Sequence, residues 1–158
     1  MITSKQIVMI DDYVELGEAV TVILEEKGFA VHFFSTFHEA IPFIETHVPD
    51  LIISDLMGHD NMTGVDFYIR HIMQKNIHFA IWTGSIDLSD TEHAKDFNLF
   101  LEEMPRGFRL TYNITDALSN READLIIEDS IRNQKAIVPI FPKPREHCVQ
   151  AILDYFRM

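Results

Sequence analysis

The stretch Leu51-Ile52-Ile53-Ser54-Asp55 decides the fold, because it is an apolar run that stops at a carboxylate. A run that is apolar at almost every position is typical of a strand buried on both faces, as in a parallel sheet between two layers of helices. Three other runs have the same character, and an aromatic-rich stretch is interpreted as a fifth strand. These segments cover residues 7–10, 79–82, 136–141 and 29–34.

Helical patterns lie between these runs. Apolar residues recur at helical spacing over 14–27, where Gly28 supplies the C-terminal stop, and again over 65–73 and 145–156. Thr36 and Glu39 have the spacing of a capping box that opens one more helix. Strands that alternate with helices predict a doubly wound α/β sheet.

The segment between the fourth and fifth runs is longer than one helix with two short loops requires. We expect an insertion at about 85–135 inside a single domain that spans residues 1–158. Helical patterns predict helices over 89–104 and 115–134, separated by Pro105-Arg106-Gly107 and a short segment at 108–112. Its apolar residues predict packing against the rest of the domain or a partner. They include Phe97, Leu99, Phe100, Leu101, Phe108 and Leu110.

The charge and composition of the chain exclude several classes of partner. Thirteen Lys and Arg against 25 Asp and Glu give a net charge of -12, which repels the phosphate backbone of nucleic acids. No apolar run approaches the length that crosses a bilayer, and the N-terminus does not have the pattern of a signal peptide. The single cysteine, Cys148, fits a reducing compartment. We therefore expect a cytoplasmic protein with no direct nucleic-acid or membrane partner.

Reactive side chains follow the strand runs at the edge where open α/β sheets place their ligands. Asp11 and Asp12 follow the first run, Asp55 ends the third, and Thr83 and Lys143 follow the last two. Converging carboxylates repel one another unless a cation lies among them, and a small oxygen-seeking ion such as Mg²⁺ suits that place. One carboxylate can then act as a nucleophile toward a phosphoryl group, while a hydroxyl and an ammonium stabilise its oxygens.

This motif set resembles the receiver domain of two-component response regulators over residues 5–84 and 136–157. The resemblance implies a flavodoxin-like, five-stranded parallel sheet of order 2-1-3-4-5, here with a helical insertion before the fifth strand. Pro139 agrees with that order, since proline within a strand is tolerated mainly at an edge and the fifth strand is an edge there.

The resemblance also implies the roles of the site residues. Asp55 is the phosphoacceptor, which takes its phosphoryl group from a histidine kinase or phosphotransfer protein. Asp12, Asp55 and the backbone carbonyl of Met57 bind Mg²⁺, and Asp11 holds the ion through water. Thr83 and Lys143 contact the phosphoryl group.

Two positions depart from the usual receiver pattern. The loop 56–64 has no proline and is one residue longer than usual, which affects the shape of the loop. Ile140 stands three positions before the lysine, where receivers usually carry a switch aromatic. We therefore do not expect the usual coupling between that aromatic and the threonine.

Three functions compete. The first is a stand-alone response regulator, not an enzyme, that signals through phosphorylation-dependent binding to a downstream protein; the chain stops at Met158 right after the last helix. The insertion then either blocks the usual receiver dimer or creates a different interface. A homodimer is one of the assemblies that this hypothesis allows. The second is a pseudo-receiver adaptor that binds partners without phosphorylation. The third is a Mg²⁺-dependent phosphohydrolase, which needs an aspartate where this chain has Met57.

Overall fold

The structure, a computed structural model, describes residues 4–55, 63–83, 106–117, 120–142 and 145–157. Its strands are β1 (Gln6–Ile10), β2 (Ala30–Phe34), β3 (Leu51–Asp55), β4 (Phe79–Thr83), β5 (Phe108–Ala117), β6 (Asn120–Asp129) and β7 (Gln134–Pro142). Its helices are α1 (Val14–Glu26), α2 (Phe37–Thr46), α3 (Gly64–Phe67) and α5 (Arg145–Arg157). A π-helical segment η1 (Tyr68–Ile72) and a 3₁₀ turn η2 (Met73–Lys75) continue α3. Among the described helices, none is long and apolar enough to span a membrane.

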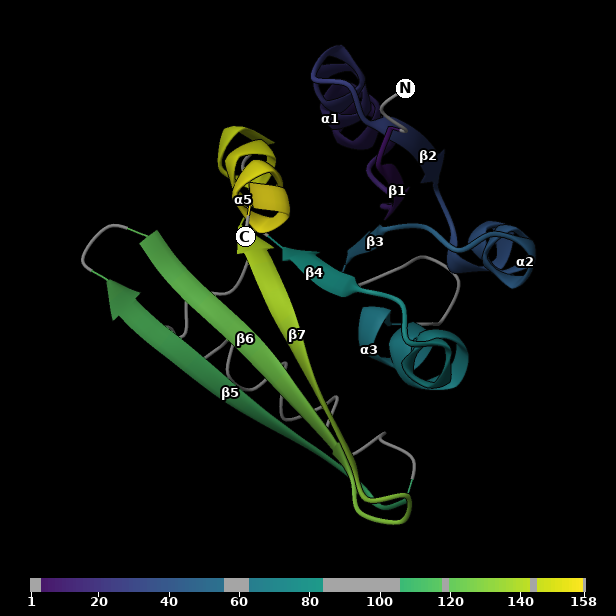
Figure 1. Cartoon of the computed structure of the whole chain (residues 1–158), viewed down its shortest axis with the longest axis vertical. Coiled ribbons are helices and arrows are strands. Elements are labelled where there is room, and N and C mark those ends of the chain that lie inside the picture. Colours follow the sequence, from purple (N-terminus) through teal and green to yellow (C-terminus); the bar gives the residue numbers. More distant parts are fainter. Residues whose placement is uncertain (1–3, 56–62, 84–105, 118–119, 143–144, 158) are drawn as a thin grey trace.

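The predicted parallel sheet is confirmed. Strands β2, β1, β3, β4 and β7 lie side by side in that order and pair in parallel, so β7 takes the place of the fifth strand in the order 2-1-3-4-5. Helices α1 and α5 lie on one face of the sheet, and α2 and α3 lie on the other (Figure 1). The predicted cap of α2 is also present, since the Thr36 hydroxyl accepts the backbone N–H of Glu39 at 3.2 Å.

The helix predicted over 115–134 is wrong. Strands β5 and β6 pair antiparallel along their full length, and β6 pairs antiparallel with β7. We call β5, β6 and β7 the ribbon; within it, β6 and β5 extend the sheet beyond β7 (Figure 1). Burial alternates along β6, with Leu125 and Ile127 buried and Ile126 half-buried, which is the period of a strand. The helix predicted over 89–104 lies outside the described residues.

The turn between β6 and β7 is fixed by local contacts. The Asp129 carboxylate is buried and accepts the backbone N–H groups of Ile131 at 3.1 Å and Arg132 at 3.2 Å. Asn133 then adopts a left-handed backbone conformation, φ 53°, which asparagine tolerates better than most residues. These contacts fix the turn that reverses the chain between β6 and β7, within the range 115–134 where the sequence predicted a helix.

Pro139 does not lie on an edge strand, because β7 is paired on both sides. Pairing with β6 includes Pro139 itself, opposite Asp124. Pairing with β4, however, begins only at Ile140. At Pro139, β7 is therefore paired with β6 but not with β4. A residue that lacks a backbone N–H is tolerated at such a position.

Two hydrophobic clusters, one on each face, hold the layers together. The cluster under α2, α3 and η1 includes four ribbon residues that are at most 6% exposed: Leu110, Leu125, Ile127 and Val138. The predicted packing of the insertion against the rest of the domain is thus confirmed at Leu110. Phe108, also named for it, is partly buried and packs against the same cluster. The remaining apolar residues named for it, Phe97, Leu99, Phe100 and Leu101, lie outside the described part of the chain.

Candidate functional site

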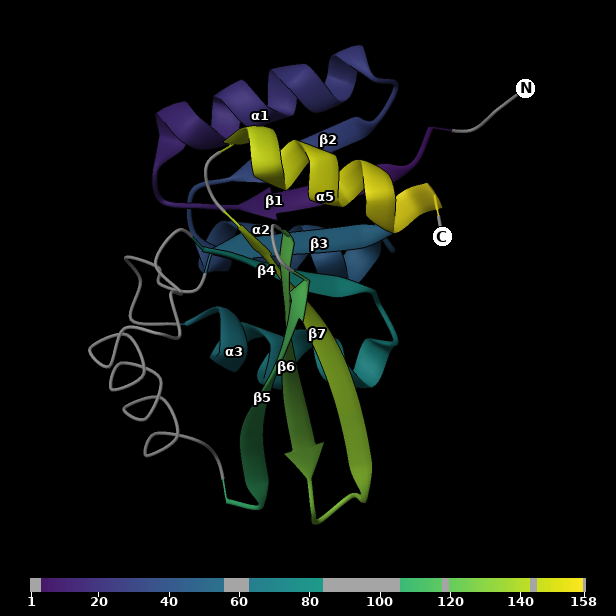
Figure 2. The ribbon, with the colours of Figure 1, turned by 90° about the vertical axis from the view of Figure 1, so that its left-hand side faces the viewer.

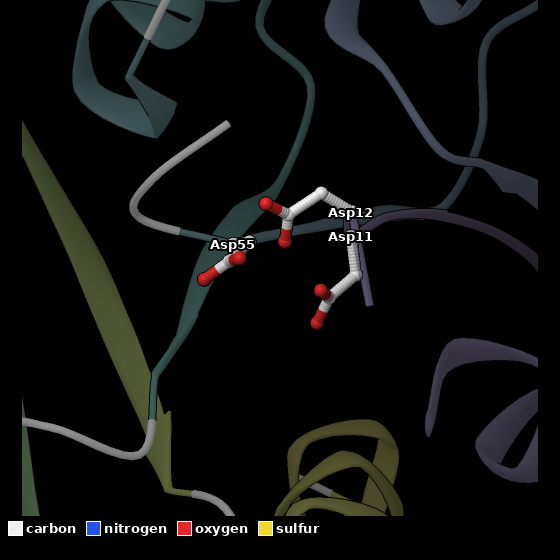
Figure 3. Close-up of side chains that lie close together, drawn as sticks. All are labelled: Asp11, Asp12 and Asp55. Atoms are coloured by element: carbon white, nitrogen blue, oxygen red, sulfur yellow. The ribbon is translucent and has the colours of Figure 1, made fainter. Parts of the chain in front are cut away.

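The structure brings three of the predicted site residues together. One carboxylate oxygen each from Asp11, Asp12 and Asp55 lies within 4.8 Å of the others. Asp11 and Asp12 follow the end of β1, and Asp55 is the last residue of the neighbouring strand β3. In Figure 3 the carboxylates of Asp12 and Asp55 lie close together, with Asp11 beside them. The register of two parallel strands therefore creates this acidic cluster.

Asp11 is held in place by the backbone. Its N–H donates to the carbonyl of Phe34 on β2 at 3.1 Å, which extends the β1–β2 ladder by one residue. Its carboxylate oxygen Oδ1 accepts the N–H of Tyr13 at 2.8 Å, just before α1 begins. The side chain is only 1% exposed, so Asp11 also anchors the strand-to-helix turn from which Asp12 projects.

Asp55 is positioned by the return of the chain after the following loop. The Ser54 hydroxyl donates to the backbone carbonyl of Asp55 at 2.8 Å. Gly64, the first residue of α3, packs against the same carbonyl, where a Cβ would approach its oxygen to 2.5 Å. Thr63 caps this helix by accepting the Asp66 N–H at 3.0 Å. Sequence reasoning did not assign these positioning roles; the spacing of Thr63 and Asp66 was the available signal.

Of the remaining predicted site residues, the structure describes only the backbone of Thr83. Thr83 is the last residue of β4 and stands opposite Pro142 in the β4–β7 register. Its backbone is therefore at the same edge of the sheet as Asp55, whose β3 position pairs with Trp82. Lys143 follows directly after Pro142 in the sequence, but Lys143 and Met57 lie outside the described residues.

The acidic cluster fits a small divalent cation. Three carboxylates this close repel one another, and a cation among them removes that repulsion. Mg²⁺ prefers oxygen ligands at about 2 Å, so two oxygens on one ion lie roughly 3–4 Å apart. The carboxylate oxygens of the cluster, within 4.8 Å, need to move together only slightly. The donor set of Asp11, Asp12 and Asp55 therefore matches the ion that the sequence predicted.

Ile140, which stands where receivers usually carry a switch aromatic, is part of the hydrophobic core. Ile140 is 8% exposed, pairs with Ile81 on β4 and Ala123 on β6, and belongs to the hydrophobic cluster under α3. A side chain packed in the core and flanked by strands on both sides cannot swing between a buried and an exposed rotamer.

Comparisons with known proteins agree with this fold. A family model described as the response regulator receiver domain matches residues 7–100. The regulatory protein VanRc of Enterococcus gallinarum is 39% identical over 57 residues, which cover 36% of this chain and only 25% of VanRc. The chemotaxis protein CheY4 of Vibrio cholerae covers 60% of this chain and 80% of its own, with 23% identity and a TM-score of 0.50. A two-component response regulator from Clostridium difficile covers 60% of this chain and 76% of its own, with 21% identity and a TM-score of 0.50.

The parallel sheet of this order, with an acidic cluster at the carboxyl ends of β1 and β3, defines a receiver-type α/β signalling protein. The chain belongs to the response regulator receiver domain family of two-component systems. Members of that family are signalling proteins that bind Mg²⁺ at an acidic pocket and interact with kinases or phosphotransfer proteins and with downstream targets.

Proposed function

We propose that this protein is a response regulator receiver that accepts a phosphoryl group on Asp55 from a histidine kinase or phosphotransfer protein. The observation that carries the proposal is the cluster of Asp11, Asp12 and Asp55 in a chain of this family. Donors of this kind work in the cytoplasm, where we place the chain. The protein switches a binding surface and turns over no substrate of its own.

Asp55 is the nucleophile of the proposed reaction. A carboxylate oxygen of Asp55 forms a bond to phosphorus as the bond from phosphorus to the donor's imidazole nitrogen breaks, and that nitrogen keeps the electron pair. Asp55 suits this role because it ends a buried strand and is held by its own backbone contacts to Ser54 and Gly64. The Thr83 hydroxyl and the Lys143 ammonium are proposed to contact the transferred phosphoryl oxygens.

The proposed metal ligands are Asp12, Asp55 and the backbone carbonyl of Met57, with Asp11 reaching the ion through water. When bound, Mg²⁺ supplies positive charge that offsets the negative charge of the phosphoryl group and of the carboxylates. Asp11 is suited to an indirect role, because one of its oxygens already accepts the Tyr13 N–H.

The output is a phosphorylation-dependent contact with a downstream protein, at the side of the sheet where β6 and β5 extend it beyond β7. Support comes from topology: β6 covers the edge of β7, so an edge that is free in a five-stranded receiver is occupied here. The surface proposed for a partner or a second copy of this chain therefore includes the ribbon.

A second candidate is the pseudo-receiver adaptor, which binds partners without phosphorylation. The buried Ile140 favours it, because the usual aromatic switch has no counterpart at that position. The intact acidic cluster favours the phosphorylated receiver instead.

Intact-protein mass spectrometry separates the two candidates. The protein is incubated with Mg²⁺ and acetyl phosphate, and the mass is compared for wild type, Asp55→Asn and Asp154→Asn. We expect wild type and Asp154→Asn, an exposed position on α5, to gain one phosphoryl group. Asp55→Asn should gain none, since an amide is not a competent nucleophile. Labelling of Asp55→Asn contradicts Asp55 as the phosphoacceptor. No labelling of folded wild type contradicts phosphorylation itself and leaves the adaptor.

A further inference from the structure

Strands β4 and β7 separate at Pro139 and form a fork in the sheet. They pair only from Ile81 opposite Ile140 to Thr83 opposite Pro142. The same register extended backward sets Ala80 opposite Pro139, which has no N–H to donate to a ladder. From there β7 stays with β6 and runs away from β4 toward the end of the ribbon (Figure 2).

The fork contains a cleft of about 470 Å³, a volume within the range of small-molecule sites. One wall comes from the η1–η2 segment and the start of β4, the other from the first half of β7, and Tyr155 of α5 closes one side. Its mouth is open, because His78, Gln134 and Lys135 are exposed. Tyr68 and Tyr155 belong to opposite faces of the sheet, so the cleft connects both faces.

Aromatic rings form much of the lining. Tyr68 packs on Phe79 with ring centroids 4.9 Å apart, and His78 meets Tyr155 edge-on at 6.0 Å. Met73 adds a polarisable sulfur. Tyr155 is half-buried, whereas Tyr68 and Phe79 are at most 8% exposed. A planar ring in the cleft therefore meets mainly Tyr155 and only small areas of the other two rings.

The polar groups of the cleft favour an anion. Among the described residues, the lining contains Lys135 and His78 and no carboxylate, in a chain that carries 25 acidic residues. Gln134 already accepts a hydrogen bond from Gln74 through its Oε1 at 2.8 Å, which leaves its amide nitrogen as the donor. Burial raises the pKa of Tyr68 and the pKa of Tyr155, so both phenols keep their protons near neutral pH and can donate.

We propose that this cleft binds a small aromatic carboxylic acid in its ionised form. The ring lies among Tyr68, Phe79 and Tyr155, and the carboxylate is held at the mouth by Lys135 and Gln134. The cleft is at the amino end of β4, whereas Asp55 pairs with Trp82 near the carboxyl end. The proposed binding site is therefore separate from the site of phosphoryl transfer.

The test is a solution NMR titration of the full chain with indole-3-acetate. Indole-3-acetamide removes the charge and cyclohexylacetate removes the aromatic ring. We expect saturable shifts from indole-3-acetate at Ile77 and Phe79 on one wall and at Val138 on the other, with both analogues binding more weakly. The same titration of Asp55→Asn should give the same result, so a failure of the phosphorylation proposal does not affect it.

Two variants decide whether the cleft is the site. Lys135→Gln should weaken indole-3-acetate by about fivefold and leave indole-3-acetamide unchanged, as expected for one partly exposed ion pair. Lys27→Gln, an exposed lysine after α1, should change neither affinity. Ile137→Trp, at a position that is 62% exposed, should fill the cleft and abolish binding without loss of thermal stability. Absence of saturable shifts, shifts confined to other residues, or an unchanged affinity in Lys135→Gln would overturn the inference.

Discussion

Gly64 packs directly against the backbone carbonyl of Asp55, and a Cβ on Gly64 would stand 2.5 Å from that carbonyl oxygen and 3.0 Å from the Ser54 hydroxyl. The chain that leaves the sheet at Asp55 thus returns to it at the first residue of α3. The obstacle is backbone, which cannot rotate away as a flexible side chain does. The absence of a side chain at Gly64 therefore sets where Asp55 lies.

Replacement of Gly64 tests this contact. Gly64→Ala should cost about 1–3 kcal/mol in the free energy of unfolding, because α3 or β3 must shift, and should slow phosphorylation by acetyl phosphate. Gly28→Ala is the matched control: its φ of 97° makes alanine strained, yet nothing lies within 4 Å of the new Cβ. Urea unfolding should register both changes, and phosphorylation only the first. Normal phosphorylation rates in Gly64→Ala would contradict the positioning role.

Magnesium should stabilise the folded protein through the acidic cluster. At a hundredfold excess over its dissociation constant, the ion adds about 2.7 kcal/mol to the free energy of unfolding. Asp12→Asn should lose most of that gain and should melt higher than wild type without Mg²⁺, because one repelling charge is removed. Thermal melts with and without Mg²⁺ measure both effects, with Asp154→Asn as the control. A Mg²⁺-induced shift of equal size in Asp12→Asn would count against the site.

The ribbon should behave as part of the hydrophobic core. Leu125→Ala and Ile127→Ala should each lower the free energy of unfolding by about 2–5 kcal/mol, because both side chains are fully buried. Ile137→Ala, on the exposed face of β7, should change it by no more than about 0.5 kcal/mol. Urea denaturation measures all three. Small effects at Leu125 and Ile127 would mean that the ribbon does not pack on the body of the sheet.

His71 should make stability depend on pH. Burial lowers the pKa of His71 from its ordinary value of 6.5, although the Glu45 carboxylate acts in the opposite direction. The unfolded chain then binds the proton more readily, so stability is present above pH 6.5 and falls as the pH drops below it. His71→Gln should flatten that part of the curve of unfolding free energy against pH. An unchanged slope would assign the pH dependence to other groups.

The parallel sheet and the acidic cluster could be predicted because their signals are local. Runs such as 51–55 are apolar at nearly every position only because helices cover both faces of the strand. Their carboxyl ends meet at one edge, which brings Asp11, Asp12 and Asp55 together without any knowledge of side-chain packing.

The ribbon could not be predicted in the same way. Leu125, Ile126 and Ile127 are consecutive apolar residues, a pattern that a helix and a strand share, and the choice depends on pairing with β5 and β7. Pro139 was interpreted from an assumed edge that β6 in fact covers. The contact between Gly64 and Asp55 depends on how a loop returns, which no local pattern contains.

The central claim, that Asp55 is the phosphoacceptor, is tested most directly by chemical trapping. The protein is treated with Mg²⁺ and acetyl phosphate, reduced with borohydride, which converts an acyl phosphate to an alcohol, and mapped by peptide mass spectrometry. We expect reduction of the aspartate at position 55 and of no other carboxylate, and none when Mg²⁺ is chelated. Trapping at another residue, or none in the folded protein, would contradict the account.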